Sequence, residues 1–204
     1  MDASSGDHVP GAHEAGSGSA HRISSSPVGG GGTLTLRQIL VPAVSMAAIV
    51  LASNWLVQFP LNAWLTWGAF SYPVAYFVSD VCNRIHGPRA ARQIAWVGFA
   101  AGLSSSALLA PVRIALASGT AFIVSQLLDV SIFNRLRKRA WWQAPLIGSC
   151  AASVIDTAIF FGLAFGGTEI SWLHLAVGDL GIKLLMAFVL LPPYRILIGR
   201  VMVR

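Results

Sequence analysis

The chain has 204 residues, of which 55% are hydrophobic and 11% charged, and its formal net charge is +6. A soluble domain has about 25% charged residues, so the composition argues against a water-soluble protein and indicates a single domain in a lipid bilayer. The basic excess is also seen in nucleic-acid-binding proteins, but here the cations cluster between apolar runs, as in cytoplasmic loops. We therefore expect no nucleic-acid contact.

Residues 1–36 differ from the rest and are predicted to be a disordered tail, followed by a transmembrane domain over residues 37–204. The first 33 residues contain eight Gly and seven Ser and show no apolar periodicity, so they cannot bury a core. They also lack the basic segment and short apolar core of a signal peptide. His8, His13 and His21 are expected to be solvated rather than to bind a metal.

Six apolar runs of roughly 20 residues follow, and each is long enough to cross a bilayer. They are Gln38–Phe59, Ala63–Cys82, Gln93–Ala110, Val112–Phe133, Gln143–Phe165 and Trp172–Leu191. Pro73 predicts a kink in the second run, Pro111 separates the third from the fourth, and Pro192 ends the sixth. The predicted fold class is an all-α membrane protein with a bundle of six transmembrane helices.

The distribution of cations predicts the orientation of these spans. With the N-terminus in the cytoplasm, 12 of the 14 Lys and Arg residues fall in cytoplasmic segments. Arg113 and Lys183 are the exceptions, and both lie at or inside a span. Because cytoplasmic loops of membrane proteins carry an excess of Lys and Arg, we expect both termini to be cytoplasmic.

Polar residues recur at helical spacing on five of the six predicted spans, so that they share one face of each helix. The sets are Asn54 and Gln58; Tyr72, Tyr76 and Asp80; Gln126 and Asp129; Ser149, Ser153, Asp156 and Phe160; and Asp179 and Lys183. A charged side chain in hydrocarbon costs several kcal/mol, so such residues usually face a protein interior or an aqueous cavity. The pattern favours a pathway or pocket for a polar solute.

Several of these residues have a structural alternative. Gln126 is expected to hydrogen-bond between helices. Asp80 and Asp129 lie near the cytoplasmic ends of their spans, where they are expected to pair with Arg84 or Arg135. These two aspartates and Gln126 are therefore assigned a structural or gating role.

The remaining charged residues are more informative. Asp179 and Lys183 form an ion pair with each other or bind a ligand, and Arg113 at the outer end is a gate or a headgroup anchor. Asp156 lies deep in its span with no cation within reach in its own helix, so it is the first candidate for a functional role.

A pocket with a carboxylate, an Asn and Gln pair, and aromatic faces suits a planar polar heterocycle. The carboxylate accepts hydrogen bonds from adjacent ring N–H and NH₂ groups, and aromatic rings stack on the flat face. Such a pocket suits a bulky hydrophobic ligand poorly.

Several motifs also resemble a known family. One block consists of Ser53–Phe59 (SNWLVQF), Thr66–Pro73 (TWGAFSYP), Asp80 and Arg84–Arg92 (RIHGPRAAR). A second consists of Arg113–Arg137 (RIALASGTAFIVSQLLDVSIFNRLR), Trp141–Trp142, Asp156–Thr157 and Phe160–Phe161. In this order, over roughly residues 38–195, they closely resemble the bacterial queuosine-precursor transporters of the vitamin uptake transporter family. The connection at Ala110–Arg113 is shorter than in that family, which bears on the role of Arg113.

The resemblance implies a multi-pass protein of the bacterial inner membrane that imports cyano- and aminomethyl-deazaguanine bases for the queuosine of tRNA. In such a protein Asp156 would bind the guanine-like edge, and Asn54 and Gln58 would orient the exocyclic oxygen. Stacking would come from Trp67, Tyr72 or Tyr76, and Asp179 and Lys183 are further binding candidates. No catalytic residue, cofactor or metal is implied, and the oligomeric state is not indicated.

Two alternative functions fit parts of the pattern. A substrate-capture subunit of an energy-coupling-factor importer is equally small, but it needs an ATPase, and no phosphate-binding loop is present in this chain. A membrane-embedded enzyme needs a set of reactive residues at one interface. His86 and Asp80 lie near each other in sequence, but no nucleophile or metal set accompanies them. We therefore favour a transporter.

Overall fold

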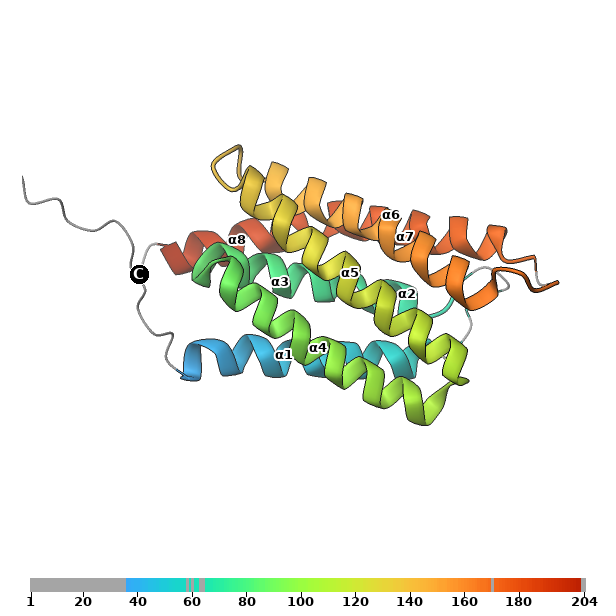
Figure 1. Ribbon diagram of the computed structural model, residues 1–204. Helices are drawn as coiled ribbons and strands as arrows, with labels where there is room; N and C mark the ends of the chain where they lie inside the picture. The colour runs from blue at the N-terminus through green and yellow to red at the C-terminus, as the bar shows by residue number, and fades with distance from the viewer. Residues whose placement is uncertain (1–35, 58, 60, 63–64, 170, 203–204) are drawn as a thin grey trace, which may run out of the picture. The chain divides into compact units, whose positions relative to one another are not determined.

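The computed structural model describes residues 36–202 except 58, 60, 63–64 and 170, so the predicted tail lies almost wholly outside the described residues. Helices dominate the described part of the chain (Figure 1). In order they are α1 Leu36–Leu56, α2 Gly68–Ser71, α3 Pro73–His86, α4 Pro88–Leu109, α5 Val112–Leu136, α6 Gln143–Phe165, α7 Leu173–Val189 and α8 Leu191–Met202. The all-α fold class is confirmed.

The predicted helix ends are accurate where a strong signal marks them. α6 has the predicted bounds, and α4 and α5 are separated only by Ala110 and Pro111, as expected. α4 begins earlier than predicted because Pro88 occupies its first position, where its missing N–H is not needed. The preceding Gly87 has φ of 89°, a left-handed conformation that glycine adopts without strain.

The second predicted span is interrupted instead of kinked. The short α2 ends at Ser71, and α3 starts at Pro73. Tyr72 links them with helical backbone angles (φ −59°, ψ −42°), so the chain continues in nearly the same direction. Pro73 cannot donate a backbone hydrogen bond, and this accounts for the interruption.

The end of the sixth predicted span is also different. Pro192 was expected to stop the helix, but α7 ends at Val189 and α8 begins at Leu191. Both prolines then fall in the first turn of α8, where backbone N–H groups have no partner within the helix and proline is tolerated. The chain is therefore helical up to Met202, beyond the predicted end at Leu191.

Four stretches of the described chain are long and apolar enough to cross a membrane: Ile39–Leu56, Val112–Leu136, Gln143–Phe165 and Leu173–Val201. They correspond to α1, α5, α6 and the pair α7–α8. Large apolar side chains are exposed along these helices, among them Val41 on α1, Leu116 on α5 and Val177 on α7. An apolar surface of this kind is compatible with lipid rather than with water.

The interior is unusually polar by comparison. α3 is the central element and contacts α1, α4, α5, α6, α7 and α8. Its buried face includes Tyr76, Ser79, Asp80 and Asn83. Because α3 is surrounded by other helices, it needs no continuous apolar surface, and its short, mixed sequence is explained by this position.

Two apolar clusters hold the bundle together on either side of this polar centre. Met46, Val50, Ile94 and Phe122 join α1, α4 and α5. A smaller cluster of Phe133, Ala144 and Tyr194 joins α5, α6 and α8. α5 packs along α6 more extensively than any other pair of helices (Figure 1).

Candidate functional site

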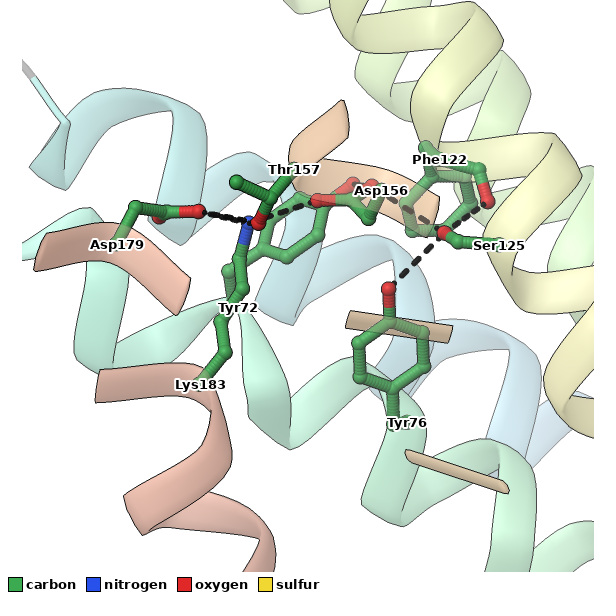
Figure 2. A network of polar contacts seen from close by, with 8 residues as sticks. All are labelled: Tyr72, Tyr76, Phe122, Ser125, Asp156, Thr157, Asp179 and Lys183. Atoms are coloured by element: carbon green, nitrogen blue, oxygen red, sulfur yellow. Dashed lines mark hydrogen bonds and ion pairs between the residues drawn. The ribbon is translucent and has the colours of Figure 1, made fainter. Parts of the chain in front are cut away.

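The centre of the candidate site is an ion triad built by α6 and α7. The Lys183 Nζ atom lies 2.7 Å from Asp156 Oδ2 and also binds the Asp179 carboxylate. Lys183 and Asp156 are both less than 5% exposed. Figure 2 shows the three side chains converging. The sequence predicted an Asp179–Lys183 ion pair as one of two alternatives, the other being ligand binding. The contact between Lys183 and Asp156 joins two helices and was not predicted.

Hydroxyl groups also donate hydrogen bonds to the carboxylates of Asp156 and Asp179 (Figure 2). Thr157 donates to Asp179 Oδ2 over 2.9 Å, and Ser125 donates to Asp156 Oδ1 over 3.2 Å. Tyr76 in turn donates to Ser125 over 2.9 Å. Ser125 was not singled out from the sequence, although it lies one turn before Asp129 and so shares its helix face.

Tyr72 lies against this triad. Its hydroxyl is 3.5 Å from Asp156 Oδ1, and its ring centroid is 5.4 Å from Lys183 Nζ. A cation within about 6 Å of an aromatic face is attracted to it, so Tyr72 also helps to hold the ammonium group.

A cavity of about 560 Å³ adjoins the triad. This is within the range of about 300–1,000 Å³ that small-molecule sites occupy. Its lining includes Asn54, Tyr72, Asp156, Phe160, Asp179 and Lys183. It extends to Leu65, Pro111 and Leu175, which lie at one end of the bundle, opposite the α3–α4 connection. Five of the eight predicted binding residues therefore surround one cavity.

Asn54 lines the cavity but is already engaged. Its amide nitrogen has two N–H groups, which are shared among Gly102 O at 3.1 Å, Ser105 Oγ at 2.7 Å and Ser106 Oγ at 3.1 Å. These contacts join α1 to α4, so the amide group fastens two helices beside the cavity. Gln58, its predicted partner, lies outside the described residues.

The other predicted aromatic residues are placed differently. Trp67 is 52% exposed, and its ring neighbour is Phe70, which does not line the cavity. Tyr76 is buried below the triad and contacts Ser125. Among the three predicted stacking residues, the structure brings Tyr72 to the cavity.

Arg113 joins the start of α5 to the end of α6. Its Nε donates to Leu163 O over 2.9 Å, and an Nη atom donates to Gly166 O. These carbonyls belong to the end of α6, where a cation is favoured by the helix dipole. Neither predicted role, gate or headgroup anchor, includes this contact with α6.

Asp80 and Asp129 are buried without the predicted arginine partners. Arg84 instead donates to the Tyr194 hydroxyl over 3.0 Å and to Arg137 O over 2.8 Å. Arg135 is exposed. Within the described residues neither aspartate forms an ion pair, so the predicted loop-fixing salt bridges are not seen. The pairing was wrong because the Arg84 guanidinium turns to Tyr194 and Arg137, and Arg135 lies on the exposed side of α5.

Apolar helices around an interior of buried charges and a cavity define a multi-pass membrane protein of the transporter class. Residues 66–112 and 104–197 match the family described as "Putative vitamin uptake transporter", and the chain belongs to this family. The resemblance stated from the motifs is thereby confirmed. The two matched stretches overlap at residues 104–112, which include the end of α4 and its short connection to α5.

Curated relatives agree with this family. The chain is 34% identical to the "Queuosine precursor transporter" of Escherichia coli, over 76% of this chain and 84% of the relative. It is 31% identical to a "Probable queuosine precursor transporter" of Haemophilus influenzae, over 71% and 79%. A protein of the same name in Bacillus subtilis is 29% identical over 62% and 69%. No solved structure matches the chain. The family and these names confirm the prediction of a transporter rather than an enzyme.

Proposed function

We propose that this chain imports queuosine precursors, 7-cyano-7-deazaguanine or its aminomethyl form, across a bacterial inner membrane. The observation that carries the proposal is the Asp156 carboxylate, buried beside Tyr72 at the wall of a 560 Å³ cavity, in a chain whose relatives bear this function in their names.

The chemistry of the cavity supports a deazaguanine ligand. The Asp156 carboxylate can accept from the adjacent N–H and NH₂ groups of a guanine-like edge. Tyr72 and Phe160 present ring faces or edges for a flat heterocycle. Both side-chain N–H groups of Asn54 are taken by acceptors on α4, so Lys183 is the better candidate to bind the exocyclic oxygen. Its third N–H has only Thr157 at 3.4 Å.

The proposed topology has six spans with both termini in the cytoplasm, α2 with α3 forming the second and α7 with α8 the sixth. The basic residues support it. Arg89 and Arg92 lie in the first turns of α4, Arg135 lies in the last turn of α5, and Arg137, Lys138 and Arg139 directly follow α5. The cavity would then open toward the outside, as an importer requires.

The test is the queuosine content of tRNA in bacteria that neither make the precursor nor have an importer of their own. Such cells would express this chain and receive a low concentration of precursor. We expect queuosine to be restored without any co-expressed ATPase. If queuosine is not restored although the protein is confirmed in the membrane, either the proposed substrate is wrong or the chain requires a partner module.

A pair of matched variants assigns the site. Asp156→Asn keeps the shape of the side chain but removes its charge, and we expect at least a tenfold loss of uptake at low precursor, since hydrogen bonds to charged groups contribute about 1.5–3 kcal/mol. Glu169→Gln makes the same change at an exposed carboxylate and should leave uptake unchanged. Equal uptake by both variants would contradict the role of Asp156.

A further inference from the structure

A second group of buried acidic residues lies apart from the ion triad. Asp80 on α3 and Asp129 on α5 are 2% and 0% exposed. Both oxygens of Asp129 and one of Asp80 have no hydrogen-bond partner among the described residues. Ser149 Oγ lies 3.4 Å from the remaining oxygen of Asp80. This pair is not part of the large cavity and has no role in the function proposed above.

The two carboxyl groups lie against consecutive residues of α6, Asp129 against Gly148 and Asp80 against Ser149, and so lie near each other. Two ionised carboxylates buried side by side with no cation in contact repel each other, so one of them must hold a proton. Lys183 is already bound by Asp156 and Asp179. Arg84 is directed to Tyr194 and Arg137.

The space around the pair favours a proton over a metal cation. A Cβ atom on Gly148 would lie 2.6 Å from Asp129 Oδ1, so the backbone of α6 covers this oxygen. A cavity of about 20 Å³ beside Asp80 has room for about one water molecule. Ser153 also lines that cavity; it is buried, and its hydroxyl has no partner within the part of the chain that the structure describes, so it can bind such a water.

The small cavity connects the pair to the proposed substrate site. Lys183 lines both the small cavity and the large one. Tyr76 and Tyr194 are the other titratable groups in the small cavity besides Asp80, and Arg84 follows Asp80 by one turn of α3. A polar route therefore runs from Lys183, the cation of the triad, through the small cavity to Asp80.

We propose that Asp80 and Asp129 together bind one proton, and that this proton enters the cell with the solute, so that uptake is proton-coupled. The pair releases its proton to the opposite side and then takes one from Lys183, through a water for which the small cavity has room. Lys183 regains a proton from water in the large cavity. One proton crosses in each cycle, and no residue keeps a changed charge. The inference rests on the proposed function for its solute.

The transport test uses the full-length chain in liposomes with the membrane potential held at zero. An inward gradient of one pH unit should drive about a tenfold accumulation of labelled precursor, since one proton per solute at this gradient corresponds to tenfold in an equilibrium. Asp80→Asn and Asp129→Asn should abolish this accumulation, whereas Glu169→Gln should retain it. Unchanged accumulation in both amide variants, or a requirement for sodium in place of the gradient, would overturn the proposal.

A spectroscopic test separates the proton site from the solute. Infrared spectra of the reconstituted protein at neutral pH should show the C=O band of a protonated carboxylic acid, which Asp129→Asn should remove and Asp156→Asn should retain. If this band behaves as expected but the wild type transports no precursor, the proton site stands and the proposed function fails. If the wild type has no such band, the proton site is refuted, whatever the variants do.

Discussion

Lys183 neutralises a site that would otherwise hold two carboxylates in a buried setting. Its Nζ atom contacts Asp156, Asp179 and the ring of Tyr72. Bringing these charges out of water is costly, and the pairing offsets that cost only while all partners remain. The triad therefore contributes little to the stability of the fold, but the loss of one member would lower that stability strongly, because it leaves an uncompensated buried charge.

We expect Lys183→Met to lower the free energy of unfolding by about 3–5 kcal/mol, the usual consequence of removing one partner of a buried ion pair. Reversible unfolding in mixed micelles would measure it. Lys138→Met, at the other lysine of the chain, is exposed and should change little. Adding Asp156→Asn to Lys183→Met should restore part of the loss. An equal stability of the two single variants would show that Lys183 does not neutralise the site.

Part of this site could be predicted from the sequence, and the reason differs from residue to residue. Asp156 is conspicuous because it lies deep in an apolar run, and Asp179 and Lys183 are paired by their spacing. The contact of Lys183 with Asp156 depends on how α6 and α7 rotate about their axes, which a single sequence does not specify. The same holds for Asp80 and Asp129, which lie against neighbouring residues of α6 in place of the arginines near them in sequence.

At the scale of elements, the contact between α5 and α6 depends on small residues. At Gly148 the two backbones approach so closely that a Cβ atom would overlap the Asp129 carboxylate. Gly162 lies farther along α6, where an added Cβ would have no neighbour within 4 Å. Small residues are common where membrane helices approach each other. An alanine at Gly148 would test both the need for a small residue and the helix propensity, whereas an alanine at Gly162 would test the helix propensity alone.

Gly148→Ala should therefore lower the free energy of unfolding by about 1–3 kcal/mol, as overpacking in a close-packed interior does. Gly162→Ala should be neutral or up to about 1 kcal/mol more stable, because alanine favours the helix. Unfolding of both variants under the same conditions would compare them. A stability loss at Gly162 as large as that at Gly148 would contradict the packing explanation.

The helices themselves were predictable to the extent that their signals are local. The ends of α6 and the break at Pro111 follow from residues at those positions. Pro192 misled the prediction, since a proline looks the same in sequence whether it follows one helix or opens the next. The second span was expected to run from Ala63 to Cys82 with a kink at Pro73, but α3 begins at Pro73, and its central position in the bundle supports a short and polar helix.

At the scale of the whole molecule, one end of the bundle is cationic, and arginine side chains at this end join neighbouring helices and connections. Arg84 and Arg137 each donate to the backbone oxygen of the other, over 2.8 and 2.6 Å. The Arg195 guanidinium lies 4.9 Å from the centre of the Trp141 ring, which joins α8 to the α5–α6 connection. This end contains the α3–α4 connection, whereas the large cavity lies toward the opposite end. Charge and cavity thus assign opposite ends of the bundle to the two sides of the membrane.

The proposed orientation predicts which positions a membrane-impermeant maleimide can reach. In a background with Cys82→Ala and Cys150→Ala, Glu169→Cys should be labelled in intact cells, because the α6–α7 connection would lie outside. Lys138→Cys, in the cationic α5–α6 connection, should be labelled only after the cells are opened, since an excess of Lys and Arg marks the cytoplasmic side. Both positions are exposed in the structure, so access to the reagent depends on the side of the membrane alone. Labelling of Lys138→Cys in intact cells would reverse the orientation, and the large cavity would then open to the cytoplasm.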